Sequence, residues 1–222
     1  MRFFHLWGEP ASERVRLALG FKRIDYELVV PDFEDDELFF ELGVSRSAPV
    51  VLWDDGLVQT ESLEIWREIE QRFPAPSLFD PLTDEQWQSI RDWRQAATRL
   101  LDRLYAPLRP AYLGVADDEG RLASYKASVQ ARFQVSLEEL ANDRYGLYAQ
   151  LDGLTHFKAL GAYVAQHGFY GPALSVADLL LVADLFPLQL LDGVSLPIDL
   201  MYYFERVQDR CGVNLRAGLV AE

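Results

Sequence analysis

Cysteine is almost missing from this sequence, which holds a single one, Cys211, among 222 residues. One cysteine excludes a disulfide within the chain and a metal site built on cysteine ligands. The three histidines, His5, His156 and His167, show none of the short spacings typical of metal-binding histidines. We therefore expect no bound metal, and a lone thiol fits a reducing compartment such as the cytoplasm.

Long hydrophobic runs are missing as well. No apolar stretch reaches the roughly 18 to 20 residues that span a bilayer. The apolar patch at the N-terminus is interrupted by Glu9 and Pro10, which makes it too short for a signal peptide. We expect a cytoplasmic protein without a membrane partner, and we interpret the first residues as a strand.

Positive charge is scarce, because 21 Lys and Arg stand against 35 Asp and Glu, a formal net charge of −14. Duplex nucleic acid and anionic membranes bind clustered Lys and Arg, so neither is expected as a partner. The excess acid is interpreted as a solvated surface that favours solubility. Half of the residues are hydrophobic, which is enough for an ordinary packed core.

Strand and helix patterns alternate over the first 73 residues. A helix between the first two strands favours their parallel pairing by a right-handed crossover. Asp54-Asp55-Gly56 between two apolar runs predicts a β-hairpin. The predicted strands cover 3–7, 24–30, 49–53 and 57–60, and the predicted helices cover 12–22, 32–42 and 63–73. This order indicates a small α/β domain.

Strand patterns largely end after a proline-rich stretch at 74–81. We place the domain boundary there, with domains at 1–75 and 83–222 and a linker at 76–82. The second domain is predicted to be an all-α helical bundle. Its helices are expected at 83–105, 117–140, 154–167, 175–191 and 200–211. The fourth of these is apolar on nearly every side, which places it at the centre of the bundle.

Ser175-Val176-Ala177-Asp178 has the spacing of a capping box at the start of that fourth helix. Ser175 can accept a hydrogen bond from the amide of Asp178, and the Asp178 carboxylate can accept one from the amide of Ser175. We interpret this pair as folding chemistry and not as catalysis.

Two pairs of residues in the first domain are candidates for ligand binding. A cis bond between Ala48 and Pro49 would leave the backbone of Ala48 open to pair with an extended peptide. Glu61 and Ser62 lie where the hairpin ends and a helix begins. The helix amides and the Ser62 hydroxyl can bind a carboxylate, and the Glu61 carboxylate can bind an ammonium group. Each pair alone also has a purely structural interpretation: Pro49 as a proline at the edge of a strand, and Ser62 as the N-cap of a helix. Together they favour a ligand with an α-amino acid group.

The sequence resembles the glutathione transferase superfamily, of the cytosolic type, over nearly its whole length. The resemblance implies a thioredoxin-like α/β N-terminal domain followed by an all-α helical-bundle domain. It also implies that Ala48 and Pro49 hold the cysteinyl backbone of glutathione and that Glu61 and Ser62 hold its γ-glutamyl end. The segments that carry the resemblance are 10–17, 49–52, 55–56, 61–62, 72–74 and 175–178.

The resemblance also implies an activity. Glutathione would be the co-substrate, the second domain would form the wall of a pocket for a small apolar electrophile, and the chain would act as a homodimer. The leading hypothesis is a transferase that joins glutathione to that electrophile by addition or substitution. The alternatives are a non-catalytic binding or regulatory protein of the same fold, and another glutathione-linked reaction such as isomerisation or peroxide reduction.

The thiol-activating position departs from the family pattern. Just before the proline of the first turn, where the serine and cysteine branches carry that residue, this sequence has Glu9. A carboxylate cannot donate a hydrogen bond to a thiolate, and its charge would raise the pKa of the thiol. The nearest hydroxyl is Ser12, which we take as the candidate catalytic residue, with a helix N-cap as the alternative role. His5 as a base, and Tyr105 or Tyr112 as hydroxyls, are further candidates.

A second departure concerns the glycyl carboxylate of glutathione. Relatives often place a basic or amide side chain near the stretch 32–37, which is acidic here. Arg46 is the only cation between residues 24 and 66. Either Arg46 binds that carboxylate or glutathione binds weakly.

Overall fold

The computed structural model describes residues 1–31, 36–45, 48–115 and 117–220. Close contacts group the chain into two compact units. The first unit holds residues 1–76, 109–123 and the residues from 210 onward, and the second holds 77–108 and 124–209. The predicted domain division at 76–82 stays a prediction. Among the described helices, none is both long and apolar enough to cross a membrane.

The first unit is built on a four-stranded mixed sheet with the strand order β2-β1-β3-β4. β1 (Arg2–Phe4) pairs in parallel with β2 (Glu27–Val29) and antiparallel with β3 (Val50–Leu52). β3 in turn pairs antiparallel with β4 (Val58–Gln59). The parallel pair flanks α1 (Pro10–Phe21), as the strand-helix-strand pattern predicts.

Helices pack on the sheet because alternate strand residues point to opposite faces. Phe4 and Val50 form a small buried cluster with Phe39 of α2 (Asp36–Glu41). Phe3, the neighbour of Phe4 in β1, points the other way and is also fully buried.

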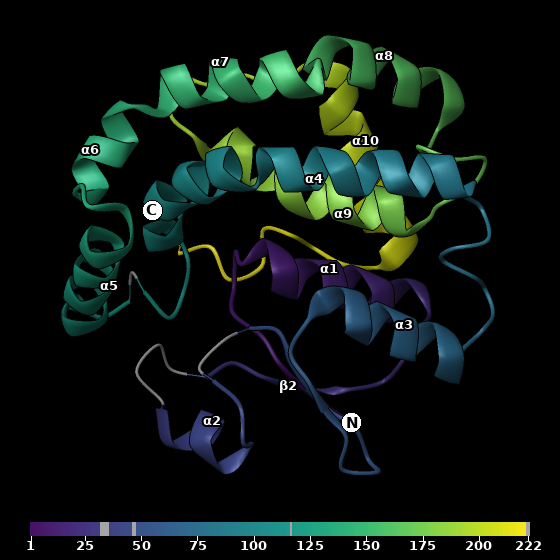
Figure 1. The fold of residues 1–222 in the computed structure, drawn as a ribbon, viewed down its shortest axis with the longest axis horizontal. Helices are drawn as coiled ribbons and strands as arrows, with labels where there is room; N and C mark the ends of the chain where they lie inside the picture. Colours follow the sequence, from purple (N-terminus) through teal and green to yellow (C-terminus); the bar gives the residue numbers. More distant parts are fainter. Residues whose placement is uncertain (32–35, 46–47, 116, 221–222) are drawn as a thin grey trace. The chain divides into compact units, whose positions relative to one another are not determined.

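The third helix of this unit, α3 (Ser62–Arg72), lies beside α1 (Figure 1). The Trp66 indole Nε1 donates a hydrogen bond to the Arg14 carbonyl oxygen at 3.0 Å, which joins the two helices. Both helices belong to the first compact unit.

The second unit contains the long helix α4 (Asp84–Tyr105), which starts at a capping box between Thr83 and Gln86. Every residue of α9 (Val176–Leu185) is buried, as expected for the central helix of a bundle. The described residues also form the helices α5 (Glu119–Phe133), α6 (Leu137–Asn142), α7 (Arg144–Thr155), α8 (Phe157–His167) and α10 (Ile198–Cys211), with the 3₁₀ helices η1 (Ala106–Ala111) and η2 (Phe186–Leu190).

The predicted helix at 117–140 is wrong, because two helices occupy this stretch. α5 ends before Gln134, whose φ of 60° is incompatible with a right-handed helix. Ser136 and Glu139 then form a capping box that begins α6. α7 lies in a stretch that the sequence pattern left unassigned.

The predicted helix at 175–191 is too long. α9 ends at Leu185, and the chain continues as η2. Pro187 lies in that segment, and it has no amide hydrogen for an α-helical hydrogen bond. The buried core of the helix is nevertheless where the sequence places it.

Candidate functional site

Glu61 and Ser62 lie at the N-terminus of α3 with their side chains available. Glu61 is the N-cap residue, exposed and with extended backbone angles (φ −90°, ψ 121°). Within the described part of the chain, neither side chain has a hydrogen-bond partner. The first amides of this eleven-residue helix also lack acceptors inside the helix. The arrangement can receive a carboxylate at the helix amides and an ammonium at Glu61.

The sheet register brings the second predicted pair to the same place. Val51 pairs with Gln59 across the hairpin. Pro49 directly precedes β3 and Glu61 comes two residues after β4, so in this antiparallel pair both lie at the same end of the hairpin. The bond between Ala48 and Pro49 is cis, as expected. Both predicted pairs of binding residues therefore lie at one end of the β3–β4 hairpin.

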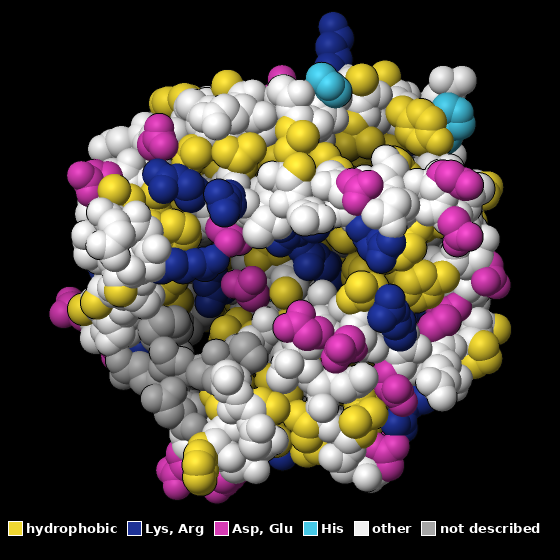
Figure 2. Space-filling view, in the orientation of Figure 1, with side chains coloured by type: hydrophobic (Ala, Val, Ile, Leu, Met, Phe, Trp, Pro, Cys, Tyr) yellow, Lys and Arg dark blue, Asp and Glu magenta, His cyan; other side chains and the backbone are white. Residues whose placement is uncertain are grey.

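Charge around this end of the sheet is only partly described. Arg46 and most of the acidic stretch 32–37 lie outside the residues that the structure describes, so the expected contact to the glycyl carboxylate stays a prediction. On the face shown in Figure 2, acidic and basic side chains are interspersed with apolar ones. That mixture agrees with the interpretation of the excess acid as a solvated surface.

The turn from β1 to α1 contains the position at which the family pattern places a thiol-activating residue. Glu9 is the N-cap of α1, and Pro10 is the first helical residue. The alternative role predicted for Ser12, the N-cap of this helix, is therefore wrong. Ser12 is fully buried, and its Oγ accepts a hydrogen bond from the Leu6 amide at 3.4 Å. The Ser12 hydroxyl therefore lies beneath the turn in this structure.

Two residues of the segment that follows α4 hold this turn in place. The Arg109 guanidinium donates a hydrogen bond to the carbonyl oxygen of Trp7. The Tyr112 ring lies against Gly8, so closely that a Cβ atom at Gly8 would lie under 3.0 Å from it. Gly218, near the C-terminus, packs equally closely on the Trp7 indole. Sequence patterns missed these contacts, because nothing local marks them.

Beneath the turn, His5 belongs to a buried polar cluster. Its Nε2 lies 3.2 Å from a carboxylate oxygen of Glu13, which also forms an ion pair with Arg16 at 2.6 Å. Desolvation lowers the pKa of His5 below its ordinary value of 6.5, and the neighbouring Glu13 only partly opposes this effect. His5 is therefore neutral near pH 7, and its full burial separates it from any ligand on the surface of the turn.

The buried His5 predicts a loss of stability in acid. Because its pKa is lower in the folded chain, the unfolded chain binds a proton more readily as the pH falls below about 6.5. His5 should thus make the free energy of unfolding decrease from pH 7.5 to pH 5.5, by at most about 1.4 kcal/mol per pH unit. We expect His5→Gln to flatten this slope in urea denaturation. The exposed His167→Gln is the control, and equal slopes in all three proteins would contradict the assignment.

The two tyrosine candidates have different surroundings. Burial raises the pKa of Tyr112 to about 12, so its phenol keeps its proton where it packs on Gly8. The Tyr105 hydroxyl donates a hydrogen bond to the Asp184 carbonyl oxygen at 2.7 Å inside the second unit. Tyr105 thus serves packing between α4 and α9.

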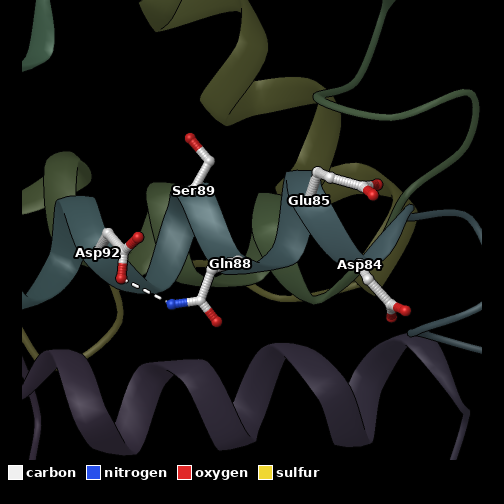
Figure 3. Close-up of a pocket in the computed structure, with 5 residues that line it drawn as sticks. All are labelled: Asp84, Glu85, Gln88, Ser89 and Asp92. Carbon is white, nitrogen blue, oxygen red and sulfur yellow. Dashed lines mark hydrogen bonds between the residues drawn. The ribbon is translucent and has the colours of Figure 1, made fainter.

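A shallow hollow on α4 is a poor alternative site (Figure 3). In it, Gln88 Nε2 donates a hydrogen bond to Asp92 Oδ1 at 2.7 Å. Carboxylates dominate the hollow and repel an anionic ligand. Its lining residues are Asp84, Glu85, Gln88, Ser89 and Asp92. Across the described chain, no cluster of three His, Cys, Asp or Glu side chains is suited to a metal ion.

Comparison with known proteins finds a family match for part of the chain. Residues 10–72 match the model of the N-terminal domain of glutathione S-transferases. Glutathione S-transferase U13 of Arabidopsis thaliana is 32% identical over 122 residues, which are 53% of this chain and 52% of that protein. The match therefore spans about half the length of this curated relative.

Solved structures share the fold over nearly the whole chain. Glutaredoxin 2 of Salmonella typhimurium, in complex with glutathione, has a TM-score of 0.80 at 18% identity, covering 96% of this chain and 95% of that one. A glutathione S-transferase of Ceriporiopsis subvermispora, also in complex with glutathione, has a TM-score of 0.68 at 16% identity, covering 100% and 98%. At these identities the likeness shows the fold, and it confirms a thioredoxin-like α/β N-terminal region followed by a helical one.

Proposed function

We propose that the chain is a member of the glutathione transferase superfamily, which the match of residues 10–72 and the partial likeness to a plant glutathione S-transferase support, and that it binds glutathione and joins it to a small apolar electrophile. The observation that carries this proposal is the pair Glu61 and Ser62. Within the described chain both side chains lie without partners at the N-terminus of α3, at the same end of the β3–β4 hairpin as the cis Ala48–Pro49 bond. Two of the proteins that share the fold are complexes with glutathione, which supports the choice of ligand.

In this proposal each part of glutathione has its own partner. The α-carboxylate of the γ-glutamyl end binds the Ser62 hydroxyl and the first amides of α3, and its ammonium binds Glu61. The cysteinyl backbone pairs with the backbone of Ala48 beside Pro49. In this proposal the thiol lies toward the turn that precedes α1. The role of Ser12 in orienting the sulfur stays a prediction, and its buried hydroxyl would have to become accessible to reach the sulfur.

We expect Glu61→Gln to weaken glutathione binding by about 10- to 100-fold, because a hydrogen bond between charged groups contributes about 1.5 to 3 kcal/mol. Isothermal titration calorimetry with glutathione measures the change. Glu64→Gln is the matched control, since it removes the same charge from an exposed position in the first turn of the same helix. Equal affinities for Glu61→Gln and the parent protein would remove Glu61 from the site.

A second candidate function is a protein that binds glutathione without using its thiol. Glu9 at the thiol-activating position and the buried Ser12 favour this reading. An assay with an aryl halide electrophile separates the two functions. Glutathione binding with conjugation supports the transferase, and binding without conjugation supports the second candidate. No binding at millimolar glutathione would reject both.

The likeness to the family also supports three broader proposals. We propose that residues 1–75 carry the glutathione site and that residues 83–222 carry the electrophile site. We further propose that the protein works as a cytoplasmic homodimer.

A further inference from the structure

Arg109 is a buried cation without a counter-ion in the described part of the chain. The residue is only 7% exposed, and its one hydrogen bond within the described chain goes to the Trp7 carbonyl oxygen. Two other buried cations of the same unit are paired, Arg16 with Glu13 and Lys22 with Glu70. Withdrawing a guanidinium from water without a compensating charge is costly, so a fold retains it where an anion binds.

The N-terminus of α1 provides a second, independent sign of an anion site at the same turn. This helix has twelve residues, and its N-cap, Glu9, makes no side-chain cap to the described chain. Amides of the first turn therefore lack acceptors inside the helix. The dipole of the helix also favours negative charge at this end. Arg109 bonds the carbonyl oxygen of Trp7 at the start of the turn, and the helix amides without acceptors, those of Ala11 and Ser12, directly follow Pro10 at its end.

The charged groups described around the turn include no ion-pair partner for Arg109. Glu13 and Arg16 neutralise each other in their ion pair. Desolvation keeps His5 neutral near pH 7. The positive charge of Arg109 lowers the pKa of His5 as well, which shows that its field extends under the turn.

Two further groups complete these surroundings. Tyr112 stays protonated, with Arg216 also near enough to act on its pKa. Glu9, on the turn itself, adds a negative charge that disfavours a thiolate. Of the charged groups named, Arg109 is the buried one that lacks a partner within the described chain.

We infer that Arg109 supplies the positive charge that stabilises the thiolate of glutathione at the Trp7–Pro10 turn and offsets the charge of Glu9. This inference rests on the proposed function. In the step concerned, the S–H bond of glutathione breaks, its proton leaves to solvent, and the electron pair stays on sulfur. Four of the five guanidinium N–H groups are uncommitted in the described chain and can donate to an anion. Arginine keeps its charge over the working pH range, so it serves as a permanent electrostatic partner.

The test measures the pKa of the bound thiol, a quantity that a merely structural role would not move. Ultraviolet absorbance of the thiolate is followed against pH for glutathione bound to the parent protein, Arg109→Gln and Arg109→Lys. Arg99→Gln is the control, because Arg99 is exposed on α4 and has no partner in the described chain. We expect a bound thiol pKa below that of free glutathione in the parent protein and in Arg99→Gln. In Arg109→Gln it should rise by about one unit, a tenfold loss of thiolate near neutral pH, and Arg109→Lys should restore part of the shift.

Each outcome bears on the inference separately from the proposed function. An unshifted thiol pKa in the parent protein, or equal values in the parent and Arg109→Gln, would overturn the role of Arg109 while glutathione binding stands. If Arg109→Gln does not fold, Arg109→Lys tests the inference instead, because it keeps the positive charge. A bound thiol pKa in Arg109→Lys equal to that of free glutathione would also overturn the role of Arg109. A parent protein that binds no glutathione rejects the proposed function itself.

Discussion

Asp178→Ala is expected to lower the free energy of unfolding by about 3 to 5 kcal/mol, a large share of the stability of an ordinary domain. The Asp178 carboxylate is fully buried and accepts four hydrogen bonds. Its Oδ2 accepts from the Ser175 amide and the Ser175 hydroxyl, each at 2.9 Å. Its Oδ1 accepts from the Tyr170 amide at 2.8 Å and the Tyr203 hydroxyl at 2.7 Å. Removing the carboxylate leaves these donors buried without an acceptor, which costs more than losing a helix cap alone.

The matched control for this variant is Glu139→Ala. Glu139 occupies the same position in the capping box of α6, where it accepts from the Ser136 amide at 2.7 Å and the Ser136 hydroxyl at 2.9 Å. This box is exposed, so water replaces the lost acceptor and we expect a loss of about 1 kcal/mol. Urea denaturation at one pH measures both variants. Losses of equal size would show that burial of the Asp178 network adds nothing to the cap.

Gly8→Ala is expected to lower the free energy of unfolding by about 3 kcal/mol. Gly8 has a φ of 68°, a left-handed backbone conformation that costs an alanine roughly 1 kcal/mol. The added methyl group would also overlap the ring of Tyr112, and such overpacking typically costs about 1 to 3 kcal/mol. The turn before α1 must therefore shift or release Tyr112.

Gly43→Ala separates these two causes. Gly43 has nearly the same φ, 69°, but no described atom lies within 4 Å of the position that its Cβ would take. We expect this variant to lose only the backbone part, about 1 kcal/mol. A Gly8→Ala, Tyr112→Ala double variant should lose less than the sum of its single changes, because the overlap is gone. Strictly additive losses of unfolding free energy in the double variant, or equal losses for Gly8→Ala and Gly43→Ala, would contradict the contact between Gly8 and Tyr112.

Much of the first unit could be predicted because its signals are local. Alternating apolar residues indicated the strands, and Asp54-Asp55-Gly56 indicated the hairpin that the structure contains. The candidate pair Glu61 and Ser62 was visible because a strand ends and a helix begins within a few residues. The helix break near Gln134 could not be predicted, since a left-handed residue other than glycine leaves no mark in an apolar pattern.

The turn before α1, where we propose that the thiol of glutathione is stabilised, depends on contacts that no local sequence pattern predicts. Arg109 and Trp7 are 102 residues apart in sequence, and the segment of Arg109 follows a helix that belongs to the second unit. Whether its guanidinium pairs with a carboxylate or stays unpaired depends on packing between distant segments. Burial withdraws the Arg109 guanidinium from water and lowers the pKa of His5. It is likewise a property of the folded chain alone.

The sequence by itself determined the α/β region with a helical region after it, the hairpin, the Asp178 cap and the residues at the start of α3. Periodicity, turn residues and caps act within a few residues, so a linear sequence displays them directly. Only the tertiary structure decided that the turn before α1 is held by Arg109, Tyr112 and the C-terminal segment, and that Ser12 lies beneath it. Those facts follow from close packing of segments far apart in the chain, which brings charges and rings together irrespective of their order in sequence.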